Sequence, residues 1–232
     1  NKTAEYLGQF GNYETSQICT QKALDVSEEH LGSEHPETAQ SLNNLGFLLN
    51  AMGDLAAARP YFERALTIRE KALGPNHPDT ARSLNNLGLL HHALGNLAIA
   101  KTFYERALAV SEKALGPDHP DTAQSLNNLG LLLKDMGDLQ AAQPYLERAL
   151  VIRERMLGPN HPGTAASLNN LGALLWAMDN LEAVQQYLER ALAITEKALG
   201  LDHPDTARVL NNLGYLSQDR GDLQASRQFY EH

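Results

Sequence analysis

The sequence has a single cysteine and no long apolar run, and each shortage excludes a class of protein. Cys19 is the only cysteine among 232 residues, so neither an internal disulfide nor a zinc site built on thiolates can form. No stretch approaches the ~18–20 consecutive apolar residues that a membrane-spanning helix needs. The N-terminal residues also lack the apolar core of a signal peptide. We therefore expect a soluble, cytoplasmic protein.

Basic residues are also in short supply. The chain has 19 Lys and Arg against 28 Asp and Glu, which gives a net charge of −9. This balance argues against a nucleic-acid backbone or an anionic membrane as the main partner. The sequence contains no phosphate-binding Gly-rich loop, zinc-protease motif or nucleophile elbow. We expect a non-enzyme with no cofactor, no nucleic-acid partner and no membrane partner.

What the sequence does contain is one stretch that returns almost unchanged. Residues 80–90 read Thr-Ala-Arg-Ser-Leu-Asn-Asn-Leu-Gly-Leu-Leu, and four further copies lie at intervals of 42 residues. Their asparagine pairs are Asn43/Asn44, Asn85/Asn86, Asn127/Asn128, Asn169/Asn170 and Asn211/Asn212. A fixed period of this length predicts a tandem array in which each unit contacts its neighbours, so we expect one elongated domain.

The period also sets the boundaries of the repeats. We expect full repeats at 35–76, 77–118, 119–160 and 161–202, with partial repeats at 1–34 and 203–232. In the first partial repeat, Gly11-Asn12-Tyr13 aligns with Gly53-Asp54-Leu55, which predicts a turn there. Because the chain begins and ends inside a repeat, we expect it to be a fragment of a longer protein or array.

Each repeat reads as two helices, here called helix A and helix B. In 77–118, Pro78 suits a first helical turn, and apolar residues at spacings of three and four then continue to about Leu94. Gly95-Asn96 predicts a turn in which Asn96 caps helix B, and Gly116 ends helix B near Leu115. In the fourth full repeat Asp179 replaces this turn glycine, so we expect its helix ends to be the least regular.

Small residues predict close packing between the two helices. A glycine recurs on helix A at Gly46, Gly88, Gly130, Gly172 and Gly214. A hairpin of ~42 residues cannot bury both of its faces alone, so the repeats must stack into one continuous core. The expected fold is all-α, an α-solenoid of stacked antiparallel helix pairs.

These features resemble the tetratricopeptide repeat. Leu-Gly on helix A, Gly-Asp-Leu at the turn and a later aromatic followed by Ala-Leu match the order of its signature. The longer phrases Leu-Asn-Asn-Leu-Gly and Leu-Gly-Pro-x-His-Pro-Asp-Thr-Ala are similar to the 42-residue repeats of kinesin light chains and of arrays attached to signalling NTPases. The resemblance covers essentially the whole chain. It implies a right-handed superhelix whose concave face, lined mainly by helix A, binds a partner peptide or protein segment.

Carried over by position, the resemblance implies a set of partner-binding residues on helix A. It comprises the ten asparagines of the pairs and two variable positions, the first occupied by Phe47, Leu89, Leu131, Ala173 and Tyr215. The second variable position is occupied by Asn50, His92, Lys134, Trp176 and Gln218. An asparagine amide both donates and accepts, so it suits a peptide backbone. The pairs have an equally good alternative role, in which one amide of each pair bridges adjacent repeats.

Three basic residues and one aromatic residue bear on specificity. Arg82, Arg208 and Lys134 would make the groove less acidic than the whole chain and admit a partner carboxylate, unless they are ordinary solvated charges. Trp176 is the strongest candidate for a single anchor, because tryptophan is enriched at interface hot spots. Its alternative role is packing against the neighbouring repeat.

The histidines do not predict a metal site. One recurs per repeat, at His35, His77, His119, His161 and His203. Stacked helices place neighbours ~10 Å apart, which is too far for a shared ion. His91 and His92 are adjacent and would lie on different sides of a helix.

The leading hypothesis is therefore a protein-interaction module. One alternative is a ligand-sensing array of a larger signalling NTPase whose catalytic domain lies outside this chain. Another is a structural scaffold that self-associates end to end through its terminal repeats. The sequence does not identify the partner.

Overall fold

The structure, a computed structural model, describes the backbone of residues 2–231 and the side chains of Tyr13 and residues 15–231. Every regular element in this part of the chain is an α-helix. The chain divides into two compact units, Asn1–Pro117 and Asp118–His232. The first unit contains α1 (Lys2–Leu31), α2 (Pro36–Ala51), α3 (Leu55–Ala72), α4 (Pro78–Ala93) and α5 (Leu97–Leu115). The second contains α6 (Pro120–Asp135), α7 (Leu139–Leu157), α8 (Pro162–Ala177), α9 (Leu181–Leu199), α10 (Pro204–Asp219) and α11 (Leu223–Glu231).

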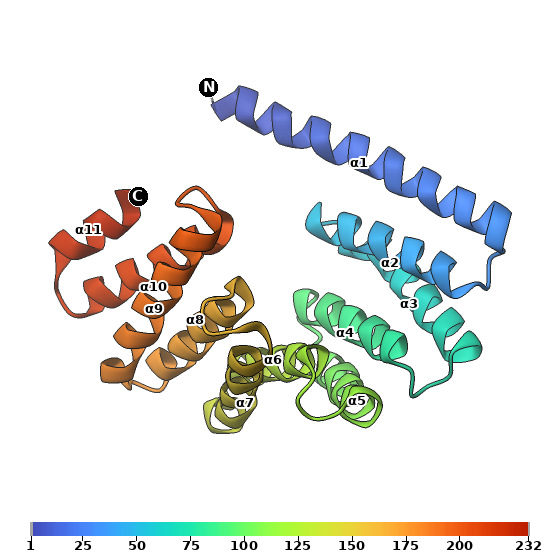
Figure 1. Cartoon of the computed structure of the whole chain (residues 1–232). Helices are drawn as coiled ribbons and strands as arrows, with labels where there is room; N and C mark the ends of the chain where they lie inside the picture. Colours follow the sequence, from blue (N-terminus) through green and yellow to red (C-terminus); the bar gives the residue numbers. More distant parts are fainter. Residues whose placement is uncertain (1, 232) are drawn as a thin grey trace. The chain divides into compact units, whose positions relative to one another are not determined.

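Within each unit the helices pack as successive hairpins (Figure 1). In the first unit helix A of a repeat packs on its own helix B, as in α2 with α3 and α4 with α5, and α3 packs on α4. The second unit repeats this order from α6 to α11. Helix A also contacts the helix A of the next repeat, in the pairs α2 with α4, α6 with α8 and α8 with α10. The predicted α-solenoid of stacked helix pairs is confirmed.

The recurring histidine starts each helix A. The imidazole Nδ1 of His77 accepts the backbone N–H of Asp79 at 3.1 Å, and His35, His119, His161 and His203 do the same at their helices. The proline that follows needs no such acceptor, because it has no N–H. The His-Pro dipeptide is therefore a helix start, a role that the spacing of the histidines did not reveal.

The turns between helix A and helix B follow a glycine in the left-handed region, with one exception. Gly95 has φ 75°, whereas Asp179 reaches φ 61° with a side chain present. The prediction that the fourth full repeat has the least regular helix ends was wrong: its helix A has the same 16 residues as the others, and the turn makes the same backbone bonds, from Asp179 N–H to the Trp176 carbonyl and from Asn180 N–H to the Leu175 carbonyl. The prediction that Asn96 caps helix B was wrong in part: Asn96 lies at the cap position, but its side chain makes no capping bond, whereas Asp54 accepts the N–H of Ala57.

The first helix departs from the prediction. The backbone of α1 is helical from Lys2 to Leu31, so the turn expected at Gly11-Asn12-Tyr13 is absent. A glycine permits a left-handed turn but does not require one. In the full repeats the turn is also held by the leucines of helix A, such as Leu42 and Leu45, which are buried against helix B. In the segment before Gly11, Leu7 stands at the position of Leu49, but Thr3 replaces the leucine at the position of Leu45.

The glycine that recurs on every helix A is needed for close packing against helix B. A Cβ at Gly88 would lie 2.5 Å from Cδ1 and Cε1 of Tyr104 on α5, a buried ring that is 1% exposed. At Gly172 the corresponding neighbour is Leu188, whose Cδ2 would lie at 3.1 Å. At Gly130 the neighbour is also a leucine, Leu146, but its Cδ2 would lie at 2.7 Å, so Gly172 alone among these glycines has slightly more room.

His91 occupies a core position that leucine fills in three other repeats, at Leu49, Leu133 and Leu175. Its ring is 5% exposed, stacks on Phe103 with centroids 5.4 Å apart, and has no hydrogen-bond partner at Nδ1. Burial lowers the pKa of His91, Arg59 lowers it further, and Glu63 opposes the shift. The neutral imidazole is therefore the form that fits the fold.

We expect Gly88→Ala to lower the free energy of unfolding by ~1–3 kcal/mol, because the new Cβ overlaps the Tyr104 ring. Gly172→Ala is the matched control. There the smaller overlap is offset by the gain in helix propensity of about 1 kcal/mol, so the change is close to zero. Chemical denaturation of the two variants measures the difference, and equal losses would contradict the packing argument.

We also expect His91 to make stability depend on pH. Since the pKa is lower in the folded state, the unfolded chain binds the proton first as pH falls below the ordinary value of 6.5. The stability that depends on a neutral His91 is therefore fully present above pH 6.5 and is lost as the pH falls towards the pKa of His91 in the folded chain. Denaturation at pH 7.5 and 5.5 should show a smaller loss for His91→Leu than for the parent chain. His92 is one residue away and half-buried, and the His92→Leu variant should lose as much stability between the two pH values as the parent chain.

Candidate functional site

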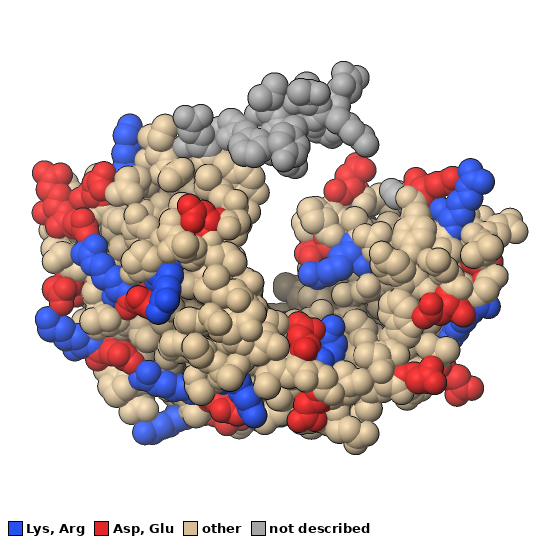
Figure 2. Space-filling model, turned by 180° about the vertical axis from the view of Figure 1, so that it is seen from behind, with Lys and Arg blue, Asp and Glu red and all other residues tan. Residues whose placement is uncertain are grey.

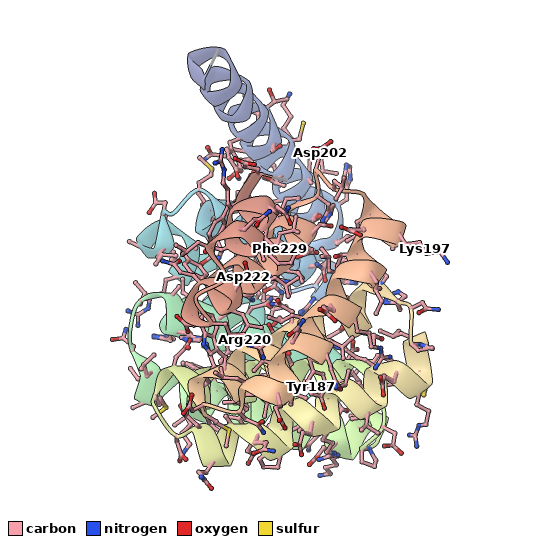
Figure 3. The ribbon with its side chains drawn as sticks, turned by 90° about the vertical axis from the view of Figure 1, so that its left-hand side faces the viewer. Tyr187, Lys197, Asp202, Arg220, Asp222 and Phe229 are labelled. Atoms are coloured by element: carbon pink, nitrogen blue, oxygen red, sulfur yellow. The ribbon has the colours of Figure 1, made fainter. Side chains whose placement is uncertain are left out.

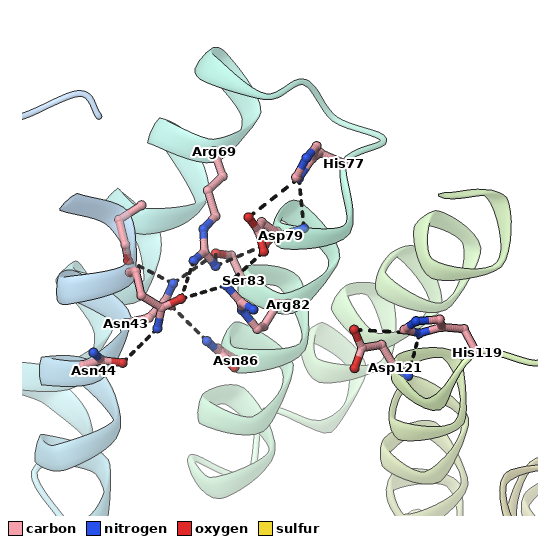
Figure 4. Close-up of polar contacts among 12 residues, drawn as sticks. Asn43, Asn44, Arg69, His77, Asp79, Arg82, Ser83, Asn86, His119 and Asp121 are labelled. Atoms are coloured by element: carbon pink, nitrogen blue, oxygen red, sulfur yellow. Dashed lines mark hydrogen bonds and ion pairs between the residues drawn. The ribbon is translucent and has the colours of Figure 1, made fainter. Parts of the chain in front are cut away.

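The asparagine pairs form a ladder that joins successive helices A. The Nδ2 of Asn86 donates to the Oδ1 of Asn43 in the preceding repeat at 2.9 Å (Figure 4). In the second unit Asn170 donates to Asn127 and Asn212 donates to Asn169, both at 2.8 Å. The second asparagine of a pair is thus the donor and the first asparagine of the preceding pair is the acceptor.

This ladder removes several predicted residues from the accessible surface. Asn43, Asn86, Asn127 and Asn169 are buried, at 1–6% exposure. Asn43 also donates to the Ala39 carbonyl and to Ser83 Oγ. The other members of the pairs are half-buried or exposed: Asn44, Asn85, Asn128, Asn170, Asn211 and Asn212. The sequence alone left two roles open for these asparagines. In the structure the buried amides bridge adjacent repeats.

The first variable position does lie at the surface. Phe47, Leu89 and Tyr215 are 41%, 39% and 52% exposed, and Leu131 and Ala173 are half-buried. Large apolar side chains at one repeated surface position are available to a partner. At the second variable position Asn50, His92, Lys134 and Trp176 are half-buried, and Gln218 is exposed.

One cleft brings four of the predicted residues together. It has a volume of about 500 Å³ and is lined mainly by the helices A of the second unit, with Arg153 and Leu157 contributed by α7. Asn127, Leu131, Asn170 and Arg208 all line it, as do Gln124 and Ala166. The cleft thus combines apolar side chains and amides with two guanidinium groups, those of Arg153 and Arg208, and with the carboxylate of Asp121. Such a mixture suits a segment that offers both backbone polar groups and a side chain.

The basic residues expected in the groove are partly neutralised by their own neighbours. Arg82 pairs with Asp79 at 2.9 Å, and Arg208 pairs with Asp205 at 3.0 Å, in each case three residues earlier on the same helix. Lys134 pairs with Asp135 at 3.2 Å. Arg82 and Arg208 remain exposed, so their net attraction for a carboxylate is modest.

Trp176 packs against the neighbouring repeat, which is one of the two roles considered for it. Its indole Nε1 donates to Asp219 Oδ2 at 2.8 Å, and its ring lies 6.2 Å from that of Tyr215. Both partners belong to α10 in the next repeat. The tryptophan nevertheless stays half-buried, so part of its surface faces outward.

Two buried arginines were missed by the sequence analysis. Arg69 on α3 is 1% exposed and donates to Gln40 Oε1, Ser83 Oγ and the Asp79 carbonyl (Figure 4). Arg153 on α7 makes the same three bonds to Gln124, Ser167 and Gly163. Each arginine therefore ties its own helix A to the helix A of the next repeat. The available signal was that Gln and Arg recur together in every second repeat, at Gln40 and Arg69 and again at Gln124 and Arg153.

Burial changes the titration of these guanidinium groups. Desolvation lowers the pKa of Arg69 to about 10, Arg82 lowers it too, and Asp79 and Glu37 oppose the shift. Desolvation also lowers the pKa of Arg153. Both groups stay charged near neutral pH, and three acceptors each compensate for the water they have lost.

The remaining surface gives little sign of another kind of site. Where residues are described, no group of three or more His, Cys, Asp or Glu is placed to hold a metal ion, and no helix is long and apolar enough to cross a membrane. Lys and Arg side chains are interspersed with Asp and Glu on the face seen in Figure 2. A mixed surface of this kind favours no single class of charged polymer.

Solved structures with the same fold include repeat proteins of several sources. BtubC (BKLC) from P. vanneervenii is 24% identical, with a TM-score of 0.76, over 94% of this chain and 88% of that one. A putative kinesin light chain of Podosopora anserina with nearly identical TPR-like repeats is 26% identical, with a TM-score of 0.69, over 85% and 93%. The apo form of RapI is 16% identical, with a TM-score of 0.67, over 97% and 93%. No curated protein matches the chain.

The family model gives the firmest comparison. The tetratricopeptide repeat model matches residues 1–71, 39–113, 89–155, 129–197 and 185–232, which together span the chain. The predicted resemblance to kinesin-light-chain-like repeats is confirmed by these matches and by the structural neighbours. The chain belongs to the tetratricopeptide repeat family.

Proposed function

We propose that residues 1–232 form a single module that binds a segment of a partner protein on the helix A face, with the cleft of the second unit as the main contact. The family supports a protein-interaction role, since its members are generally non-catalytic scaffolds. The observation that favours this cleft is the meeting of Leu131, Asn127, Asn170 and Arg208 around about 500 Å³. We propose no catalytic step and no cofactor for this chain.

The partner segment would be held by the exposed side chains more than by the asparagines. The buried amides of Asn127 and Asn169 already bond to the next repeat. Leu131 and Tyr215, by contrast, offer apolar surface at a position that varies between repeats. Apolar anchors with a polar rim are the usual arrangement of an interface hot spot. Specificity would therefore come from the variable positions, and the ladder would keep them in register.

We expect Leu131→Glu to weaken binding of a partner segment about tenfold or more, because it places a charge in the apolar part of the cleft. A suitable ligand is a peptide enriched from a random display library on the whole chain, with its affinity then measured by fluorescence anisotropy. Val151→Glu is the matched control, since Val151 lies on α7 at 60% exposure and outside the cleft. Failure to enrich any peptide, or an equal loss in both variants, would count against the proposal.

The ladder predicts a different response for the buried amides. Asn127→Ala leaves the Nδ2 of Asn170 without its acceptor, which should lower the free energy of unfolding by ~1–3 kcal/mol. Asn44→Ala is the comparison, because Asn44 is exposed and should change stability by less than ~0.5 kcal/mol. Chemical denaturation measures both. If Asn127→Ala had the same free energy of unfolding as the parent chain, the ladder would contribute little to stability.

A further inference from the structure

The last hairpins carry a cluster of three aromatic rings and one carboxylate, formed by Trp176, Tyr215, Tyr230 and Asp219. The rings of Trp176 and Tyr215 lie 6.2 Å apart, and those of Tyr215 and Tyr230 lie 5.7 Å apart in an edge-to-face arrangement. Tyr215 and Tyr230 are 52% and 44% exposed. The indole N–H is bonded to Asp219, which fixes the carboxylate beside the rings.

The electrostatics of this cluster favour a cation. Asp219 is the last residue of α10, where the helix dipole adds partial negative charge. Asp179 and Asp222 lie in the neighbouring turns at the ends of α8 and α10. Exposed aromatic faces next to a carboxylate bind a lysine or arginine side chain through cation–π and ionic attraction together.

The basic side chain next in sequence does not neutralise the cluster. Arg220 donates to Gln185 Oε1 and, at 2.6 Å, to the Leu181 carbonyl, so its guanidinium is held against the start of α9. Figure 3 labels Arg220 and Asp222 at the turn between α10 and α11. Within the described residues Asp219 forms no ion pair, and its one bond is to the uncharged indole of Trp176.

The cluster also shares a face with the cleft. Arg208, Asn212, Tyr215 and Asp219 follow one another on α10 at intervals of four, three and four residues, which places them on one side of the helix. Arg208 lines the cleft. A segment that lies in the cleft therefore comes within reach of the rings, since the eleven residues from Arg208 to Asp219 span about 16 Å along the helix.

We propose that this cluster receives a lysine or arginine side chain of the partner segment, so that the module prefers partners with a basic residue near the bound stretch. This inference rests on the proposed binding of a segment to the helix A face. The net charge of −9 agrees with a basic partner. The carboxylate fixes one side of the bound cation and the tyrosine face fixes the other.

The cluster can be tested without knowing the partner, because Trp176 is the only tryptophan and reports directly from it. Tryptophan fluorescence of the whole chain is titrated with acetyl-Gly-Arg-Gly-amide and acetyl-Gly-Lys-Gly-amide. The neutral control is the same tripeptide with citrulline, which keeps the shape of arginine and removes its charge. We expect a saturable change with the two cationic peptides only. An equal response to citrulline, or no response, would overturn the proposal.

Two variants locate the effect. Asp219→Asn keeps an acceptor for the Trp176 N–H and removes the charge, and Tyr215→Leu keeps apolar packing and removes the aromatic face. Each should weaken the binding of the cationic tripeptides about 5- to 30-fold, which is the range expected for a cation–π contact with a nearby charge. Asp202→Asn, which removes a charge before the start of α10, should have no effect. Equal weakening by Asp202→Asn would mean that net charge alone attracts the peptides.

This experiment and the peptide selection can fail independently. If peptides selected on the cleft bind and depend on Leu131 while arginine tripeptides give no signal, the proposed function stands and the cation site is wrong. If the tripeptides bind the cluster but no selected peptide depends on Leu131, the cleft is not the binding site. When both succeed, acetylation of the lysine in a selected peptide should weaken its binding about 5- to 30-fold.

Discussion

Within each of the two units, one amide-to-amide hydrogen bond joins the helices A of neighbouring repeats. The bond of Asn86 to Asn43 is buried, and its equivalents in the second unit are partly buried. A buried amide without a partner costs stability, so a shift of one repeat against the next would expose that cost. The ladder thus disfavours any other stacking register of the repeats.

This register decides what the helix A surface can present. Once the asparagines are turned to their neighbours, the residues four positions after the first asparagine of each pair stay at the surface, among them Phe47, Leu89 and Tyr215. Those positions differ between repeats, while the ladder positions do not. The ladder positions, which are constant, therefore join the repeats, and the variable position contributes side chains to the surface on which we propose that a partner binds.

Much of the architecture followed from the sequence, because period, glycine and proline act locally. Helix A of the second full repeat was expected to reach about Leu94 and ends at Ala93, and its helix B ends at Leu115 as expected. The role of His77 as a cap also depends on a local contact, but histidine is not a usual capping residue, so no pattern indicated it. The prediction of a turn at Gly11 was wrong, because a glycine allows a left-handed turn but contacts with neighbouring helices are needed to hold one.

The candidate site was harder to predict, since it depends on which way side chains turn between repeats. Adjacent helical residues differ by about 100° in direction, and the sequence does not say which of Asn127 and Asn128 faces the next helix. The pairing of Trp176 with Asp219 joins positions in different repeats and has no counterpart elsewhere in the array. Periodicity describes what the repeats share, whereas this cluster is built from what they do not share.

The buried arginines have a consequence for how such a chain can grow. Arg69 and Arg153 occur in every second repeat, each with its glutamine on helix A, while Ser111 and Thr195 occupy the same position in the repeats between them. Loss or gain of one repeat by recombination within the gene would break this alternation and set two like repeats side by side. Loss or gain of two would preserve it. The buried arginines thus give the array a second period of two repeats, or four helices, which is twice the length of the structural repeat.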